Sequence, residues 1–251
     1  MTADAPRHWL LLRGLAREAR HWGTLPPRFA ARIAPAHVLD LPGVGTEVGR
    51  AVPPTIAGIV DDLRARWRAA GHAGPHGLMA ISLGGMIAMD WCARYPEDFS
   101  RVVLVNSSAS NLSWPWERLR PVNLPGVLRA AFARDPAVRE QQILEMTTNL
   151  ARPLDAKVEE WAAYARERPV TPDVARRQLL AALRFRAPTR ITVPMCVLAS
   201  RADRFVDVRC SERIADHFGA RLALHDAAGH DLPMDAPEWV LDQVERFLAE
   251  A

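Results

Sequence analysis

Short runs of apolar residues alternate with amphipathic stretches towards both ends of the chain, and this pattern predicts alternating strands and helices. Runs that are apolar at nearly every position are typical of parallel strands that are buried on both faces. Six runs are expected to be strands: 8–13, 36–41, 78–81, 101–106, 193–200 and 221–225. Helices are expected between them, over 55–70 with Thr55 as the N-cap, after Ser82, near 209–218, and from Glu238 onward.

The middle of the chain has a different pattern. From 113 to 186 we find no strand-like run, and repeated prolines divide the stretch into short helical pieces with aromatic residues among them. So long a segment without structure of its own would be unusual in a compact domain, so a helical insertion is predicted. The expected organisation is a core made of 1–112 and 188–251, with a helical lid insertion over 113–187.

One stretch combines a strand, a sharp turn and a helix. The run Leu78–Ile81 is followed by Ser82, then by Leu83-Gly84-Gly85 and a long apolar segment. A serine at such a turn is lifted off the end of the sheet, and the amide of Leu83 lies at a helix N-terminus where it can donate to an oxyanion. The usual pattern is G-x-S-x-G, and Ala80 stands here in place of the first glycine.

Two further loops carry the groups that would activate this serine. Asp203 follows the strand expected at 193–200, and Gly229-His230 follows the strand expected at 221–225. Ligands of open α/β sheets bind beyond the carboxyl ends of such strands. A serine hydroxyl needs a base to accept its proton, and histidine oriented by a carboxylate suits that role at neutral pH.

The chain resembles the α/β-hydrolase superfamily over nearly its whole length. The residues that carry the resemblance are the elbow 81–85, the loop around Asp203, the pair Gly229-His230, and the run 37–43 before the first helix. The resemblance implies a mostly parallel sheet of about six strands with helices on both faces, a trimmed N-terminal hairpin, and a helical lid. Within the superfamily the chain is most similar to small carboxylesterases such as the pimeloyl-carrier-protein methyl ester esterases.

The resemblance also assigns roles to individual residues. Ser82 would be the nucleophile, His230 the general base and then the acid, and Asp203 the carboxylate that orients the imidazole. We expect Asp203 to do this in preference to two nearby acids: Asp207 is interpreted as a helix N-cap, and Asp231 directly follows the histidine.

The expected oxyanion hole consists of the Leu83 and Leu15 amides. Gly14 would let the loop after the first strand come close to the site. The family usually has His-Gly at this point, whereas this chain has Arg13-Gly14, so we expect an Arg13→His change to be tolerated.

Candidate substrate-binding residues are less strongly indicated. We assign Gly14, Trp22, Trp114 and Trp116 to this group, although packing within the lid is an alternative role for the last two. His21 and His225 are rival bases; His225 falls inside a strand, where it is expected to pack, and His21 beside Trp22 is expected near the entrance.

Composition narrows the classes of function. The formal net charge is only +3, nearly all of the positive charge is arginine, and Lys157 is the sole lysine. No basic run with interleaved aromatic residues suggests a nucleic-acid partner, no stretch is long enough to span a membrane, and the N-terminal apolar run is too short for a signal peptide. A cytoplasmic location is therefore expected. The three cysteines fit neither a disulfide framework nor a zinc site, so no metal or cofactor is expected.

These observations favour a serine hydrolase that cleaves a carboxylic ester or thioester through an acyl-enzyme, acting on a small molecule that is free or carrier-protein-bound. A lyase or acyltransferase with the same residues is one alternative, and a non-catalytic ligand-binding protein of the same fold is another. Fold alone does not separate them.

Overall fold

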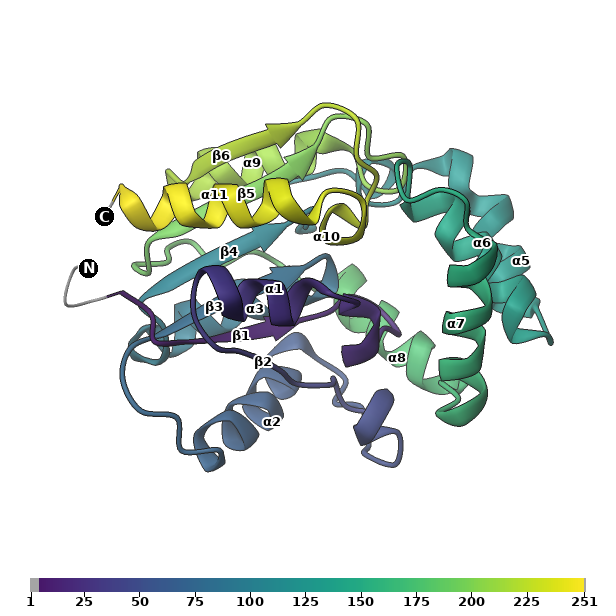
Figure 1. The fold of residues 1–251 in the computed structure, drawn as a ribbon, viewed down its shortest axis with the longest axis horizontal. Helices are drawn as coiled ribbons and strands as arrows, with labels where there is room; N and C mark the ends of the chain where they lie inside the picture. The colour runs from purple at the N-terminus through teal and green to yellow at the C-terminus, as the bar shows by residue number, and fades with distance from the viewer. Residues whose placement is uncertain (1–4, 251) are drawn as a thin grey trace.

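The computed structural model describes residues 5–250. Its centre is a six-stranded sheet in which every described pairing is parallel, in the order β2-β1-β3-β4-β5-β6 (Figure 1). The strands are β1 (His8–Leu12), β2 (Ala36–Val38), β3 (His76–Ile81), β4 (Arg101–Val105), β5 (Met195–Ser200) and β6 (Arg221–His225). The six predicted strands are all confirmed.

Helices cover both faces of the sheet, as expected for parallel strands. One face packs against α2 (Ile56–Ala69), α3 (Leu83–Arg94) and α9 (Val208–Phe218), and the other against α1 (Leu25–Arg32) and α11 (Pro237–Ala249). Side chains of each strand alternate between these two cores: Leu10 faces the first and Leu11 the second. The remaining core helices are the short α10 (Leu232–Asp235) and the 3-10 turns η1 (Ala19–Trp22), η2 (Gly45–Glu47) and η3 (Pro96–Asp98).

The segment between β4 and β5 contains only helices among its regular elements. They are α4 (Pro115–Arg118), η4 (Pro121–Asn123), α5 (Leu124–Phe132), α6 (Pro136–Thr147), α7 (Asp155–Glu167) and α8 (Pro172–Arg184). Leu144, Val158 and Trp161 form part of a small apolar cluster of their own there. Figure 1 shows α5, α6 and α7 at the end of the sheet towards which the strand arrows point. The division of the chain into a core and a lid stays a prediction.

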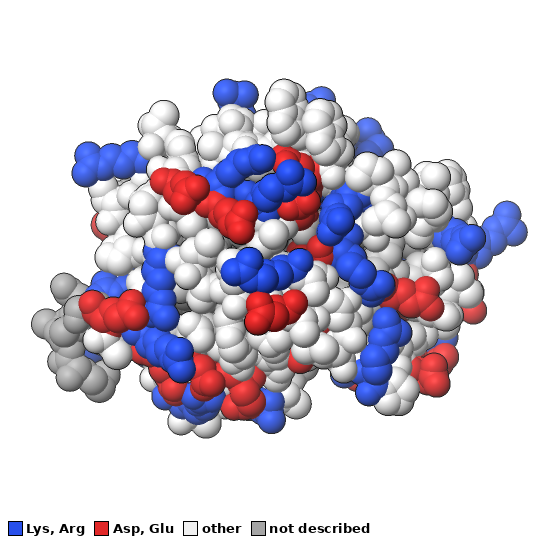
Figure 2. Space-filling model, turned by 90° about the horizontal axis from the view of Figure 1, so that it is seen from above, with Lys and Arg blue, Asp and Glu red and all other residues white. Residues whose placement is uncertain are grey.

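Charged side chains do not segregate by sign on the face drawn in Figure 2, where blue and red residues are interspersed. Exposed ion pairs also join helices α1 and α11, such as those of Arg32 with Glu238, Asp242 and Glu245. Among the described residues, no helix combines the length and the apolar composition needed to cross a bilayer.

Candidate active site

Ser82 occupies the sharp turn between β3 and α3. Its backbone has φ 57° and ψ −117°, a conformation that costs a residue other than glycine on the order of 1–3 kcal/mol. The Ser82 amide donates to the carbonyl of Val105 over 2.9 Å, which holds the turn against β4. A Cβ at Gly84 would stand 2.6 Å from the carbonyl oxygen of Leu12, so only glycine lets the helix approach the neighbouring strand here.

Asp203 and His230 lie beside each other beyond the ends of β5 and β6. The His230 Nδ1 and an Asp203 carboxylate oxygen are 2.7 Å apart, and both side chains are buried. The other carboxylate oxygen accepts the amides of Phe205 at 2.7 Å and Val206 at 2.9 Å, which fixes its orientation. Because an ionised carboxylate can only accept, Nδ1 carries the proton and Nε2 is left as the basic nitrogen.

The two other nearby acids have different partners. The Asp207 side chain accepts the amide of Arg209 over 3.0 Å as the N-cap of α9, as predicted. Asp231 turns away from its neighbouring histidine and receives two hydrogen bonds from Arg13. Of the three carboxylates considered, only Asp203 contacts the imidazole of His230.

The rival histidines make other contacts. His21 is buried with its ring edge-on to Trp161, and its desolvation, reinforced by the charge of Arg17, holds its pKa well below the usual value. His225 accepts the amides of Ala227 and Ala228 at its Nδ1. Neither ring contacts a carboxylate among the described residues, so neither is oriented as a general base would be.

Two residues that the sequence analysis did not select hold the histidine loop. Asn106, which has φ 44°, donates to the His230 carbonyl over 2.8 Å, and its own oxygen accepts the Ser200 amide. Asp235 accepts the Gly229 amide at 2.6 Å and the Asn149 amide at 2.7 Å, so it ties this loop to the helical insertion. A lone asparagine and a lone aspartate carry no motif, and only their contacts identify them.

The loop after β1 lies directly against the serine. A Cβ built on Gly14 would stand 3.1 Å from the Ser82 Cβ and 3.6 Å from its Oγ. The next residues are held by Gln178 of α8, whose side-chain oxygen accepts the Ala16 amide at 2.9 Å. The amide of Leu15 has no hydrogen-bond partner among the described residues, and neither has that of Leu83. Their role as an oxyanion hole stays a prediction.

Arg13 joins this loop to the histidine loop. Its guanidinium donates to both oxygens of Asp231, over 3.0 and 2.6 Å, and also lies 5.0 Å from the ring centre of Trp22. Both members of the ion pair are about 5% exposed. The expectation that Arg13→His would be tolerated considered only the backbone of the loop, and this buried pair overturns its premise, because histidine offers no bidentate fork.

The predicted substrate-binding tryptophans lie in two different environments. Trp22 is buried in the apolar core between the sheet and helices α1 and α11, and Arg13 lies over its ring. Trp114 and Trp116 stack on each other with ring centres 5.1 Å apart and are 60% and 56% exposed. A role of any of the three in binding substrate stays a prediction.

Two other features were considered as possible sites of chemistry: the buried cysteines and a small cavity. Burial raises the pKa of Cys196 to about 12 and that of Cys210 to about 11, so these thiols stay protonated at neutral pH and are poor nucleophiles. A small cavity of about 50 Å³ separates the loop after β1 from the insertion, bordered among others by Ala16, Glu140 and Tyr164.

Comparisons with known proteins agree with this architecture. A family model described as serine aminopeptidase S33 matches residues 6–237. No curated protein matches the sequence significantly.

Many solved structures are similar. They include a lipase candidate from Acinetobacter baumannii AYE, with 20% identity, a TM-score of 0.78, and coverage of 99% of this chain and 85% of that one. The 2-hydroxy-6-oxo-6-phenylhexa-2,4-dienoate hydrolase of Rhodococcus sp. RHA1 has 20% identity, a TM-score of 0.78, and coverage of 98% and 92%. An esterase from Thermogutta terrifontis has 18% identity, a TM-score of 0.74, and coverage of 99% and 91%. At this identity the likeness shows the fold, which is that of the α/β hydrolases.

Proposed function

Because the chain belongs to the serine aminopeptidase S33 family of α/β hydrolases, we propose that it is a serine hydrolase that cleaves a carboxylic ester or thioester. The observation that carries the proposal is the contact of His230 with Asp203, at the carboxyl ends of the strands where Ser82 also occupies its strained turn. A base oriented in this way and a serine lifted off a strand are the two requirements for nucleophilic catalysis by a hydroxyl group.

The proposed reaction proceeds in two halves. The Ser82 Oγ attacks the acyl carbon while the Nε2 of His230 takes the hydroxyl proton, and Asp203 stabilises the imidazolium. The carbonyl oxygen, now negative, accepts hydrogen bonds from the Leu15 and Leu83 amides. The imidazolium then protonates the departing alcohol or thiol. A water molecule, deprotonated by the same imidazole, releases the acid and restores the serine.

Ester cleavage is favoured over removal of an N-terminal amino acid by the state of the nearby acids. An aminopeptidase needs an unpaired carboxylate for the substrate's ammonium group. Here Asp231 is paired with Arg13, Glu140 with Arg17 over 2.6 Å, and Asp235 with backbone amides. Asp231 and Glu140 are buried and Asp235 is half-buried, and none of these three acids is free to bind an amino terminus.

The proposed substrate is a small-molecule ester or thioester that is free or bound to a carrier protein. Gly14 faces the serine and would border the acyl carbon. If Trp114 and Trp116 border the acyl chain, alanine at either position should change the rate ratio between octanoate and acetate esters. An unchanged ratio in both variants would leave the pair with only its stacking role.

The test is a panel of p-nitrophenyl esters from acetate to octanoate, measured beside aminoacyl p-nitroanilides of equal concentration. We expect turnover of at least one ester, and a loss of roughly 10³-fold or more in kcat for Ser82→Ala. Ser100→Ala is the matched control, because Ser100 lies just before the amino end of β4, and this variant should keep full activity. Preferential cleavage of the anilides would contradict the ester assignment, and undiminished activity of Ser82→Ala would contradict the nucleophile.

Failure of the whole panel would favour the alternatives. A lyase or acyltransferase would still be labelled at Ser82 by a fluorophosphonate, because labelling needs only the activated serine. A non-catalytic binding protein would show neither labelling nor turnover.

A further inference from the structure

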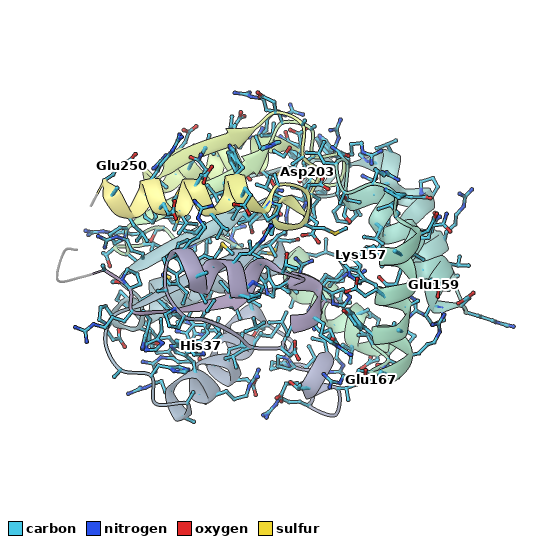
Figure 3. All side chains as sticks on the ribbon, in the orientation of Figure 1. His37, Lys157, Glu159, Glu167, Asp203 and Glu250 are labelled. Atoms are coloured by element: carbon cyan, nitrogen blue, oxygen red, sulfur yellow. The ribbon has the colours of Figure 1, made fainter. Side chains whose placement is uncertain are left out.

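Four of the eight histidines gather near the amino ends of the parallel strands, away from the carboxyl ends where Ser82 lies. His8 begins β1, His37 lies in the edge strand β2, His72 lies in the loop between α2 and β3, and His76 begins β3. In Figure 3 the labelled His37 lies on the α2 side of the molecule, well apart from Asp203. His72 and His76 are four positions apart, whereas His8 and His37 are distant from them and from each other in the sequence. A metal site here therefore differs from the expectation, drawn from the cysteines, that no metal is bound.

Three of the rings converge closely enough to share one ion. One nitrogen from each of His8, His37 and His72 lies within 4.8 Å of the other two, and all three side chains are half-buried. The His8 Nδ1 and the His37 Nε2 are 3.1 Å apart. A tetrahedral zinc site with bonds of about 2.0–2.1 Å places its ligand nitrogens about 3.3 Å from each other. Small rotations of the side chains would therefore complete three ligands.

The donor atoms of this group decide which class of metal ion it would suit. Neutral imidazole is the ligand form, because a protonated ring has no lone pair to donate. No carboxylate takes part in the three-residue group, so its donor set is imidazole alone, which suits zinc, copper or nickel better than magnesium or calcium.

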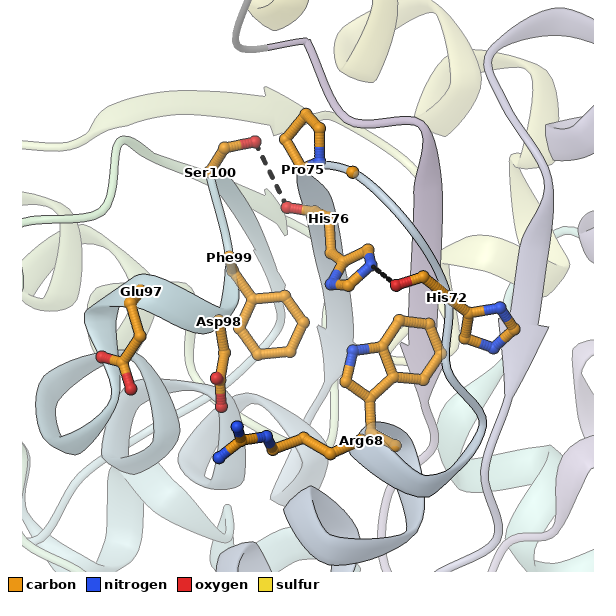
Figure 4. A pocket seen from close by; sticks show the side chains of 10 residues that line it. Arg68, His72, Pro75, His76, Glu97, Asp98, Phe99 and Ser100 are labelled. Atoms are coloured by element: carbon orange, nitrogen blue, oxygen red, sulfur yellow. Dashed lines mark hydrogen bonds between the residues drawn. The ribbon is translucent and has the colours of Figure 1, made fainter.

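Neighbouring groups pack against the rings, and a cavity lies beside one of them. The indole of Trp67 packs against His72 with ring centres 4.5 Å apart, and the His76 Nε2 lies 3.2 Å from the His72 carbonyl oxygen (Figure 4). His72 and His76 border a cavity of about 320 Å³, whose other walls include Glu97 and Phe99. Contacts that orient the ligating rings are a regular part of protein metal sites.

We propose that His8, His37 and His72 bind one divalent transition-metal ion of the zinc class, with water completing its coordination. Such an ion would fasten the edge strand β2 and the loop before β3 onto β1. The ion would lie near the amino ends of the strands and Ser82 lies at their carboxyl ends, so the proposal stands whether or not the chain is an ester hydrolase. It also predicts that the ion changes stability and leaves the chemistry at Ser82 unaffected.

The experiment titrates chelator-treated protein with Zn²⁺ by calorimetry and with Co²⁺ by visible absorption, at pH 7.5. We expect one ion per chain, intense Co²⁺ bands of a low-coordinate site, and a melting temperature that rises with Zn²⁺ concentration. Mg²⁺ should have none of these effects. Loss of one direct ligand, in His37→Ala or separately in His72→Gln, should weaken Zn²⁺ binding by more than about 100-fold, since even contacts behind the ligands are worth 10–100-fold.

The matched control is His217→Ala, which removes a histidine on α9 whose Nε2 lies 2.8 Å from the carbonyl oxygen of Pro188. Its affinity for Zn²⁺ should equal that of the original chain. The proposal is overturned if Zn²⁺ does not bind saturably, or if binding survives in both His37→Ala and His72→Gln. It is likewise overturned if His217→Ala abolishes binding, because the ion would then be an adventitious surface ligand.

Discussion

Replacing Arg13 with methionine should destabilise the fold by about 3–5 kcal/mol, because it removes one partner of a buried ion pair and leaves the other charged in the interior. The pair consists of two hydrogen bonds, over 3.0 and 2.6 Å, between the Arg13 guanidinium and Asp231. Each side chain is about 5% exposed, so water cannot replace the lost partner. Methionine keeps most of the apolar stem, and the effect therefore reports the charge and not a cavity.

A double-mutant cycle separates the pair from other contributions. Asp231→Leu should also be costly, whereas Arg13→Met combined with Asp231→Leu should be more stable than Arg13→Met alone, because apolar replacement of both members of a buried pair is often close to neutral. Arg176→Met is the control, since it breaks an exposed pair with Asp173. That change should leave the urea midpoint almost unchanged, because exposed ion pairs contribute little to stability.

The assay is urea unfolding at pH 7, followed by circular dichroism, with kcat and KM measured on each folded variant. The pair joins the loop that carries Leu15 to the residue beside His230, so the double variant should be stable and slower in kcat. Arg13→His should behave more like Arg13→Met than like the original chain. If Arg13→Met lost less than about 1 kcal/mol and kept full kcat, the pair would be neither a stabilising nor a positioning contact.

Three further changes test separate parts of the site. Asp203→Asn should keep the fold and lower kcat by up to roughly 10⁴-fold, because the amide favours the wrong tautomer of His230. Asp207→Asn should mainly lower the melting temperature. If kinetic and melting measurements gave the reverse ranking, Asp207 and not Asp203 would be the acid that orients His230. Gly14→Val should nearly abolish turnover and Gly14→Ala should reduce it less, since the new Cβ would meet the nucleophile's Cβ at 3.1 Å; equal rates for both variants and the original chain would rule out this close approach. Burial lowers the pKa of His21 below its usual 6.5, so the unfolded chain binds more protons below about pH 6.5 and stability falls as the pH drops; His21→Phe should flatten the fall between pH 7 and 5 in urea melts, and an unchanged slope would contradict the assignment.

Apolar runs were sufficient to predict the sheet. The unbroken series 102–105 became β4, and Thr55 caps α2 by accepting the Gly58 amide over 3.1 Å. The second strand proved shorter than the expected 36–41. Asp40 leaves the sheet there, and its carboxylate accepts the amides of Ala19 and Thr46. The hydrophobic periodicity of a sequence predicts which residues are buried. It does not show where a polar side chain such as that of Asp40 finds its hydrogen-bond partners.

Short and irregular elements were the harder part. The helix α1 was not among the predicted helices. Pro26 and Pro27 lie in its first turn, where proline is well tolerated. Buried contacts between distant residues were also beyond the sequence. Arg13 and Asp231 are 218 positions apart, and nothing in the pattern of either segment indicates that the two meet.

The residues of the candidate site also fall into two groups: those that the sequence pattern could indicate and those that it could not. Serine, aspartate and histidine could be selected because each follows a predicted strand, and parallel strands bring their carboxyl ends to one edge. The residues that hold them, Asn106 and Asp235, follow from no such rule. Their side chains satisfy backbone amides and carbonyls of loops whose course depends on the whole fold.

The central claim is that Ser82 is an activated nucleophile, and peptide mapping after fluorophosphonate labelling tests it most directly. Intact mass should show one adduct per chain, and fragmentation should place it on Ser82. The adduct should be absent in Ser82→Ala, and its formation should be slowed by orders of magnitude in His230→Ala, in which the serine remains but its base is lost. An adduct on another residue, or undiminished labelling of Ser82→Ala, would contradict the account.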